Sequence, residues 1–403
     1  MLLERFIRVK IWDSTNTTVE YDNYDDTLTQ PDWGVSAGSV NINKVICDTE
    51  LSFGDTNASK LELQIFGLYE ETIDPQTGEV VSRTNIPILG RKIQVIVEDD
   101  IQNDNYLVNE DDDILSTEDD ESLHGGYSVT HEQTYLFTGF VESSKTDYES
   151  TYTDITAYDW FYFKGEQNVY QWLSSYLYVH PDGELGQLMQ AFIIQFVPAN
   201  MRTSDLYTNL LVNPTIYRAV VQTLLESKEL ITIKTMFKCI YEIQCWCPYI
   251  DGEGIIRVKK FVSNMPTTSI APDTYEHENS TWEDYTTYGI DYLRIYSNGN
   301  LITAGGSLNY DNAYDIPDAL LLSRATVTNT VFDTLLNNMR GLEEFTPFEI
   351  HMIVSDLSLQ LGDFISTEKG DGYIMEIEYS GSLLVDQTIK CNAQGQSLTP
   401  KIT

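Results

Sequence analysis

Short stretches in which apolar and polar residues alternate recur along much of the chain, and this alternation is its most constraining feature. It is clearest in Arg5–Ile11 and returns in residues 61–65, 93–97 and 135–141. Successive side chains of a β-strand point to opposite faces, so a period of two predicts strands with one buried face. Asp, Asn, Ser and Gly residues, which are typical of turns, separate the stretches. We therefore expect an antiparallel meander or small β-barrel over residues 1–165.

Residues 166–275 differ in character and predict an α+β domain. Asn213 followed by Pro214 is typical of a helix start, because Asn caps the first N–H groups and proline fits the first helical position. Apolar residues recur at helical spacing after this pair and again in residues 233–243. Two apolar runs around an Asp-Gly turn in residues 249–259 then predict a hairpin packed against the helices.

Strand patterns resume in the last domain, residues 276–403. Alternation in residues 290–295 leads to the hairpin signal Asn298-Gly299, a helix is expected over about 329–340, and strands are expected over the rest. The predicted fold class is mainly β with an α+β middle. Two similar β-barrel domains, the first and the last, flank a helix-containing insertion domain.

The first and last domains close with the same order of elements, and both series open with Leu-Gly. Either this is a duplicated β-barrel or it is the ordinary pattern of strands and turns. A duplicated barrel would let three copies form a ring of six similar units, matching a sixfold partner with true threefold symmetry. The corresponding stretches are 89–95, 135–143 and 154–158 in the first domain and 361–367, 373–380 and 388–391 in the last.

The charge balance narrows the possible functions. The 403 residues include 62 Asp and Glu against 24 Lys and Arg, a formal net charge of −38 at pH 7. Binders of nucleic acid or of anionic membranes gain affinity from Lys and Arg, so both classes are disfavoured. A cation, a metal ion or another protein is the expected partner. No apolar run suits a signal peptide or a membrane span, which predicts a cytoplasmic product without membrane insertion.

Acidic residues are densest between Glu98 and Glu121, where 12 of 24 residues are Asp or Glu. Like charges at this density repel one another, so we predict an extended acidic loop at about 98–131 between two strands. A site for a cation or a basic partner is the functional alternative. The residues 109–121 lack the central glycine that a calcium-binding loop needs, which favours a solvated loop.

The cysteines do not predict disulfides or a zinc site. Their number is odd, and no second Cys or His pair at zinc-finger spacing follows the Cys245 and Cys247 pair. We expect buried structural thiols instead. The five cysteines are at positions 47, 239, 245, 247 and 391.

We also find no pattern of residues that predicts catalysis. The histidines are scattered, and no serine lies in the Gly-x-Ser-x-Gly pattern of a nucleophile elbow. His351 falls in a strand pattern and is expected to be half-buried. The pairs Gly252/Gly254 and Gly370/Gly372 are interpreted as hairpin turns, because no third glycine and helix follow them. The sequence thus predicts a protein that is not an enzyme, with no catalytic, cofactor-binding or metal-binding residues.

The order of these elements resembles the tail hub or baseplate hub proteins of tailed phages and prophages, including the N-terminal structural region of tail-associated tail-tip proteins. The resemblance spans most of the chain. It lies in the order of the motifs rather than in any one of them. The stretches that carry it are 60–67, 90–95, 136–143 and 154–159, then 237–245 with 249–256, and finally 361–365 with 381–395.

The resemblance implies a homotrimer whose six barrels form a ring under the tail tube, in the virion tail tip. Expected partners are a tail tube or distal tail protein, a tape measure protein, and a tip spike or fibre protein. DNA would pass through during ejection without specific binding, and carboxylates lining the channel would let it slide. Many tail-associated relatives in this family continue into a peptidoglycan-cleaving or fibre domain, and this chain, which ends at Thr403, is expected to lack the part that cuts peptidoglycan.

Two other functions remain open at this point. The chain contains six Trp and 26 Tyr residues, which would suit a receptor- or carbohydrate-binding tail protein if they gathered on one exposed face. A peptidoglycan hydrolase with an unrecognised site is the less favoured alternative. A hub must be trimeric through its barrels, whereas a lectin need not be, and clearance of peptidoglycan would identify a hydrolase.

Overall fold

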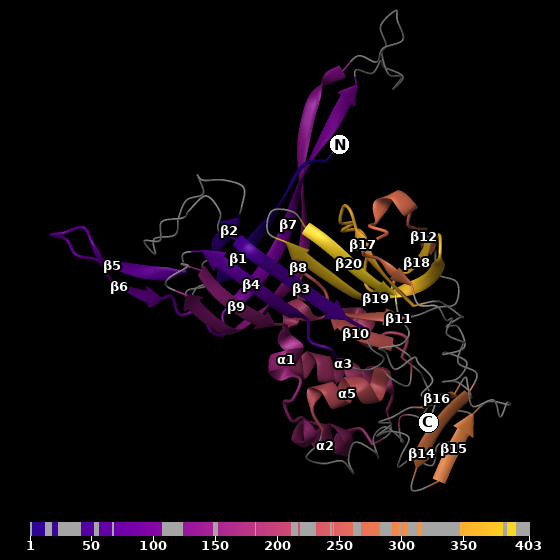
Figure 1. Ribbon diagram of the computed structural model, residues 1–403. Coiled ribbons are helices and arrows are strands. Elements are labelled where there is room, and N and C mark those ends of the chain that lie inside the picture. The colour runs from indigo at the N-terminus through magenta and orange to yellow at the C-terminus, as the bar shows by residue number, and fades with distance from the viewer. Residues whose placement is uncertain are drawn as a thin grey trace, which may run out of the picture. The chain divides into compact units, whose positions relative to one another are not determined.

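Figure 1 shows the computed structural model of the chain, which forms two compact units. Unit 1 consists of Met1–Val45, Glu62–Thr156 and Gly381–Val385; unit 2 contains the rest of the chain. The predicted division into three domains, with boundaries near residues 165 and 275, stays a prediction. The structure describes residues 2–12, 18–22, 42–51, 56–66, 68–106, 124–147, 152–181, 183–210, 217, 231–241, 244, 246–260, 267–282, 292–297, 300–304, 313–315, 347–381 and 385–391.

Unit 1 is built from β-strands, in the order β4–β9–β8–β7–β1–β2, and β3, whose residues are divided between the two units, pairs with β4. The pairs β1–β2, β1–β7 and β7–β8 are antiparallel, and β5 and β6 form a separate antiparallel hairpin. All four stretches with strand alternation lie in strands, as predicted. The bounds are β1 Leu2–Trp12, β2 Thr18–Asp22, β3 Ile42–Glu50, β4 Lys60–Phe66, β5 Tyr69–Ile73, β6 Val80–Asn85, β7 Lys92–Tyr106, β8 His124–Asp147 and β9 Tyr152–Tyr158.

Burial alternates along β1 and β4, which confirms the period of two there, whereas β7 is buried without a break over residues 93–98. In β1, the side chains of Ile7, Val9 and Ile11 are at most 1% exposed. In β4, Leu63 and Ile65 are buried, while the residue between them is partly exposed. Because these apolar faces are removed from water together, their burial holds the strands of this unit in register.

The acidic segment is more regular than its charge predicts. We expected a loop from Glu98 onward, and that boundary is wrong. Strand β7 continues to Tyr106, β8 begins at His124, and the two strands pair along this length. The residues between them, 107–123, lie outside the described part of the chain.

Two arginines of β1 explain why the acidic strand can form. Arg5 donates from Nε and Nη2 to the two carboxylate oxygens of Asp99, at 2.6 and 2.7 Å. Arg8 Nη1 lies 3.1 Å from Glu98 Oε1, which also accepts a hydrogen bond from Gln133. Opposite charges on the neighbouring strand thus offset the repulsion that local sequence alone predicts.

Unit 2 combines helices with further strands. Its largest sheet contains β13–β17–β20–β19, with β18 beside β19 and β12 parallel to β18; β10–β11 and β15–β14–β16 form two small sheets. The helix bounds are α1 Trp160–Lys164, α2 Tyr170–Val179, α3 Leu185–Phe196 and α5 Ile233–Tyr241. The strand bounds are β10 Trp246–Ile250, β11 Ile256–Lys260, β12 Thr267–Ser269, β13 Thr281–Trp282, β14 Tyr292–Ser297, β15 Asn300–Ala304, β16 Ala313–Asp315, β17 Phe348–Met352, β18 Phe364–Thr367, β19 Gly370–Gly381 and β20 Val385–Cys391.

The helices of unit 2 pack around an aromatic core. Phe237 of α5 is fully buried, and its ring centroid lies 5.3 Å from that of Phe161 and 5.9 Å from that of Phe192. Helix α5 confirms the second predicted helix, and β10 and β11 confirm the hairpin that follows it. The helices predicted after Pro214 and over 329–340 lie outside the described residues, except for helical Tyr217. No helix in the described part of the chain is long and apolar enough to cross a membrane.

The predicted mainly-β class with a helical middle is confirmed, and the Leu-Gly repeat has a structural counterpart in both units. In unit 1, Gly90 has a φ of 71°, a left-handed backbone that favours glycine. Three hydrogen bonds define its turn. Gly90 N–H donates to Val141 O, Val141 N–H donates back to Arg91 O, and Arg91 N–H donates to Ile88 O.

The second turn repeats this geometry bond for bond. Gly362 has a φ of 74°. Gly362 N–H donates to Ile374 O, Ile374 N–H donates back to Asp363 O, and Asp363 N–H donates to Gln360 O. The same three donors and acceptors, counted from the glycine, are therefore used in both turns.

The strand register repeats as well. Three residues after each glycine lies a fully buried isoleucine, Ile93 or Ile365, and each is paired with a glycine of the next strand, Gly139 or Gly372. The sequence comparison set Tyr373 against Tyr135. The register corrects this, because Tyr373 corresponds to Phe140.

The order of strands is also the same in both units. In unit 1, the strands β4, β7, β8 and β9 lie side by side in the order β4–β9–β8–β7, and in unit 2 the strands β17 to β20 lie in the order β17–β20–β19–β18. In each set, the strand that comes first along the chain pairs with the strand that comes last. The β5–β6 hairpin lies between the first strand and the turn only in unit 1. The chain thus contains one four-stranded arrangement twice.

Candidate interaction sites

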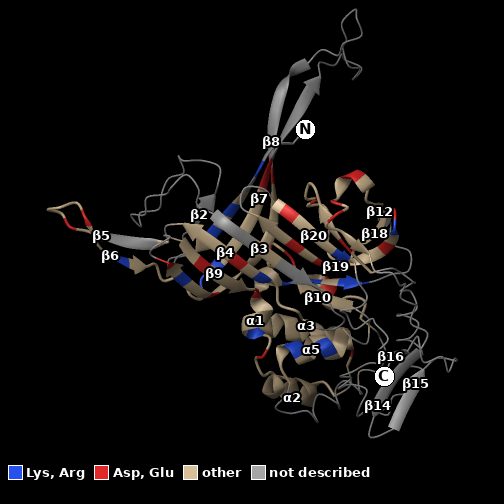
Figure 2. Cartoon of the chain, in the orientation of Figure 1, with Lys and Arg blue, Asp and Glu red and all other residues tan. Residues whose placement is uncertain are grey.

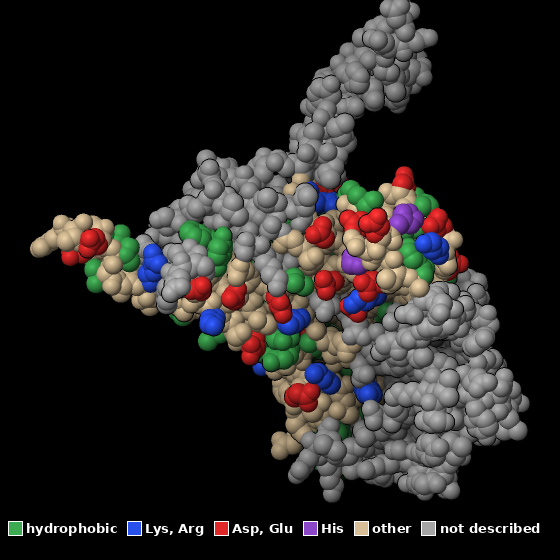
Figure 3. Space-filling model, in the orientation of Figure 1, with side chains coloured by type: hydrophobic (Ala, Val, Ile, Leu, Met, Phe, Trp, Pro, Cys, Tyr) green, Lys and Arg blue, Asp and Glu red, His purple; other side chains and the backbone are tan. Residues whose placement is uncertain are grey.

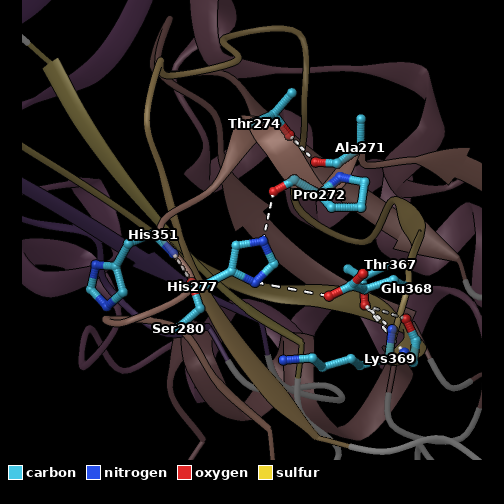
Figure 4. Close-up of polar contacts among 10 residues, drawn as sticks. Ala271, Pro272, Thr274, His277, Ser280, His351, Thr367, Glu368 and Lys369 are labelled. Atoms are coloured by element: carbon cyan, nitrogen blue, oxygen red, sulfur yellow. Dashed lines mark hydrogen bonds and ion pairs between the residues drawn. The ribbon is translucent and has the colours of Figure 1, made fainter.

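A polar cluster of unit 2 lies where residues 270–282 run beside β17. Glu276 N–H donates to His351 O at 2.8 Å, and Ile353 N–H donates to Thr274 O at 2.9 Å. The cluster holds two of the five histidines of the chain (Figure 4). Histidine side chains lie among acidic ones on the face shown in Figure 3. This is the place in the described structure where acid–base chemistry is most worth testing.

The ring of His277 lies between a main-chain carbonyl group of its own segment and a glutamate from beyond β18. Its Nε2 lies 2.9 Å from Pro272 O, and its Nδ1 lies 3.8 Å from Glu368 Oε1. Figure 4 shows the ring between these two partners. About half of the side chain is exposed. The contacts position the ring, but no serine or cysteine is among the residues that hold it.

His351 is half-buried in a strand, as predicted, and its ring is also held on both sides. Nε2 lies 3.2 Å from Glu349 Oε1, and Nδ1 lies 3.0 Å from Thr388 Oγ1. Ser280 Oγ accepts a hydrogen bond from the His351 main-chain N–H, while the ring points away from it (Figure 4). The histidine therefore does not activate this serine, and the arrangement is not that of a nucleophile and its base.

The described cysteines, at positions 47, 239, 247 and 391, are buried thiols, as predicted. Burial raises the pKa of the Cys391 thiol well above its usual value, which keeps it protonated and unreactive. Cys245 lies outside the described residues. Among the residues that the structure describes, no group of three or more His, Cys, Asp or Glu side chains is placed to hold a metal ion.

Asp159 is a buried carboxyl group with a structural position. It caps helix α1: Oδ1 accepts from Phe161 N–H at 2.9 Å, and Oδ2 accepts from Ser59 N–H at 2.8 Å. Desolvation by burial raises its pKa to about 7, although the main-chain hydrogen bonds from Ser59, Phe161 and Tyr162 act in the opposite direction. Both oxygens accept hydrogen bonds from the protein's own main chain, so we assign this carboxyl group a structural role rather than a catalytic one.

Four of the five tryptophans in the described part of the chain are buried or covered on one ring face by a lysine. Trp160 is buried. In three others, a lysine ammonium group lies over the indole ring. Nζ of Lys260, for example, lies 3.9 Å from the ring centroid of Trp246. Trp246 also stacks on Tyr241. Carbohydrate recognition through stacking needs a free ring face, so these four described tryptophans do not favour the receptor-binding alternative. The other two pairs are Lys92 with Trp12 and Lys369 with Trp282.

Helices α2 and α3 present a different kind of surface. Neither helix contains a charged residue, although 21% of the chain is charged. Figure 2 shows both without the red and blue seen on other elements. Tyr178, Val179 and Ile194 are 89%, 67% and 56% exposed. Exposed aromatic and apolar residues without charge are typical of protein-binding surfaces, and sequence analysis did not single out this region.

Comparison with known proteins gives matches in structure only. No protein-family model and no curated protein matches the chain. A tail protein from Neisseria meningitidis MC58 is 8% identical with a TM-score of 0.49, and the match covers 97% of each chain. The 43 kDa tail protein of prophage MuSo2 from Shewanella oneidensis is 9% identical with a TM-score of 0.45, over 96% of this chain and 97% of that one. The chain is similar to tail proteins over almost its whole length.

A third solved structure is a component of the type VI secretion system of E. coli, described as similar to the T4 bacteriophage tail proteins gp27 and gp5. It is 9% identical with a TM-score of 0.39, and the match covers 90% of this chain and 76% of that one. The class of protein named by these structures is the one that the sequence resembles.

Proposed function

We propose that the chain is a structural subunit of a phage tail tip, in which three copies form a hub ring of six similar β-domains. The duplicated four-stranded arrangement, with its two equivalent glycine turns, is the observation that carries the proposal. A chain that contains one arrangement twice can present six similar elements from three copies. Such a ring adapts a sixfold tail tube to a threefold tip.

We propose further that each four-stranded arrangement belongs to a β-barrel. Exposed strand edges invite unwanted pairing, and closure of a sheet removes them. The strands next to the repeat support this proposal, because β1 extends the sheet beyond β7 and β12 extends it beyond β18.

The proposed partners follow from the position in the tail. A tube or distal tail protein lies on one side, a spike or fibre protein on the other, and the tape measure protein ends near the lumen. DNA passes through the ring without specific binding, because a chain of net charge −38 offers it no counterion release. A channel wall that proved neutral or basic in the assembled ring would contradict this role.

Measuring the mass of the purified chain over a range of salt concentrations tests the trimer. Three copies bring −38 charges each into one ring, so added salt should favour the three-copy species by screening their repulsion. A trimer that dissociated on adding salt would contradict the electrostatic argument. Microscopy of the tail particle, asking whether three copies surround its axis, tests the location.

An enzymatic role has a direct test as well. The proposal makes the chain a structural component, so the purified protein should leave a peptidoglycan gel intact. Clearance of the gel would favour the hydrolase alternative.

A further inference from the structure

The β5–β6 hairpin of unit 1 stands away from the strands that precede and follow it (Figure 1). Its base is anchored, because Leu68 and Ile86 are buried and Ile86 N–H donates to Leu68 O at 3.5 Å. Beyond the base, every residue from 72 to 85 is exposed except Asp74 and Arg83, which are half-buried. A two-stranded hairpin is only marginally stable in water, so one this exposed is an element that a partner would stabilise.

The outer half of the hairpin carries an apolar patch. Ile73 is 55% exposed and pairs with Val80, which is 44% exposed. Val81, the extra residue of a β-bulge, is 66% exposed. The turn beyond the patch is closed by a hydrogen bond of 2.8 Å from Gly78 N–H to Asp74 O. The patch, seen in green near the end of the hairpin in Figure 3, therefore belongs to folded structure and does not come from fraying.

The construction of the hairpin favours contact through its side chains. Of the strands that the structure describes, none pairs with β5 or β6 besides these two themselves. The bulge at Val81 interrupts the regular ladder, and bulges at sheet edges hinder the addition of a further strand. Ile73 and Val80 are cross-strand neighbours, so their side chains leave the same face of the hairpin. A partner is therefore expected to pack apolar side chains of its own against this face.

The surface of helices α2 and α3 in unit 2 has matching chemistry. Neither helix contains a charged residue. Tyr178 and Val179, at the end of α2, are 89% and 67% exposed, and Ile194 of α3 is 56% exposed. The tip of the hairpin carries Asp74 and Glu79, which carboxylates elsewhere on a chain of net charge −38 would repel. On these two helices they would meet no carboxylate.

The number of copies identifies the occupant. In a ring of six similar domains, an element shared by both four-stranded arrangements occurs six times. The hairpin interrupts only the arrangement of unit 1, and α2 and α3 belong to unit 2 alone, so each occurs three times. A second copy of the chain supplies one receiving surface for each hairpin, whereas a sixfold tube would present twice as many sites as there are hairpins. Contact between two different surfaces closes into a ring when it is repeated head to tail.

We propose that the β5–β6 hairpin of one copy docks on the α2–α3 surface of the next copy, where Ile73, Val80 and Val81 cover exposed apolar side chains of those helices. The inference rests on the trimer of the proposed function. Because the contact is apolar on both sides, its strength comes from removing these side chains from water. Salt acts separately, by lessening the repulsion between the acidic chains.

Self-association of the full-length chain tests the proposal, measured by sedimentation at physiological and raised salt. Val81→Glu on the hairpin and Tyr178→Glu on α2 each place a carboxylate in the apolar contact, and each should weaken association at least about tenfold. Leu89→Glu and Val354→Glu are matched controls, since these apolar residues are 65% and 62% exposed and lie outside both surfaces. They add the same charge and should associate like the native chain.

A photo-reactive amino acid at position 81 identifies the surface that the hairpin contacts, in a mixture of isotopically light and heavy chains. Peptides that join position 81 to residues 170–196, one light and one heavy, are expected. Cross-links to other residues, or within one chain only, would overturn the docking site and leave the trimer standing. Native-like association of both glutamate variants would do the same, once thermal unfolding has shown that the variants fold.

The oligomeric state of the native chain distinguishes failure of the docking site from failure of the trimer. A native chain that stayed monomeric at every salt and protein concentration would overturn the second copy as occupant together with the trimeric hub. A native trimer whose association is lost in Val81→Glu and Tyr178→Glu, but kept in the two controls, is the expected result.

Discussion

Replacing each of the two turn glycines by alanine should distinguish the backbone conformation, which the two turns share, from the side-chain contacts, in which they differ. Gly90 and Gly362 have φ values of 71° and 74°. A non-glycine residue in this left-handed region costs about 1 kcal/mol. That cost applies equally to Gly90→Ala and Gly362→Ala. At Gly90 the new methyl group meets nothing within 4 Å, so the free energy of unfolding should fall by about 1 kcal/mol and no more.

At Gly362 the methyl group collides with a side chain. It would lie 2.3 Å from Cγ of Lys259 and within 3 Å of Cδ and Cε. The lysine can rotate away, but it then loses its ion pair with Asp363. The two side chains are 19% and 32% exposed, so this pair is worth about 0.5–1 kcal/mol. Losing the packing of one or two methylene groups adds about 1 kcal/mol. Gly362→Ala should therefore cost about 2–3 kcal/mol in total.

The assay is equilibrium denaturation, with hydrogen exchange measured by mass spectrometry to show which unit is affected. A Lys259→Ala background supplies the control. With the lysine side chain removed, Gly362→Ala should cost only about 1 kcal/mol, the value expected for Gly90→Ala. If Gly90→Ala proved as costly as Gly362→Ala, or if the lysine background made no difference, the assignment of the two turns would be refuted.

Three other predictions concern the interior of each unit. Phe237→Ala should cost about 3–5 kcal/mol of unfolding free energy, and Tyr178→Ala, at an 89% exposed position, about 0.5 kcal/mol or less. Arg5→Gln and Asp99→Asn should each cost about 2 kcal/mol, because both side chains are only 14% exposed, and a double-mutant cycle should show coupling. The pKa of Asp159 is raised to about 7 when folded and is about 3.9 unfolded, so its proton stabilises the folded state below pH 4, and this is lost as the pH rises to 7. Asp159→Asn should remove that pH dependence, roughly 4 kcal/mol at most, in denaturation series across pH.

Local sequence predicted the helices and strands that have one apolar and one polar face. Helix α5 was predicted because Lys234 and Lys238 contrast with buried Ile233 and Phe237. Helices α2 and α3 were not, because they lack charges on every side and give little contrast between faces. The strands β14 and β15 were predicted through Asn298-Gly299, a turn signal that is itself local.

Features set by distant residues were harder to predict. The acidic segment was expected to be a loop because its charges repel one another. The residue that neutralises Asp99 is Arg5, which is 94 positions away in the sequence. Similarly, the Leu-Gly pairs indicated a repeat, but the true alignment of Tyr373 with Phe140 depends on strand register. Local patterns specify which residues form strands, whereas the choice of partner comes from packing across the sheet.

The difference between the two turns explains why a duplicated arrangement need not have duplicated contacts. Both copies keep the glycine that the left-handed backbone requires and the isoleucine that packs opposite a second glycine. These residues are fixed by the main chain, so they are the same in both copies. The next residue after the turn glycine faces the surroundings, and there the charge is reversed, from Asp363 to Arg91. Because Lys259 neutralises Asp363 within the chain, a lysine could not cover Arg91 in the same way. The reversal of charge therefore prevents the first turn from having the cover that Lys259 gives the second.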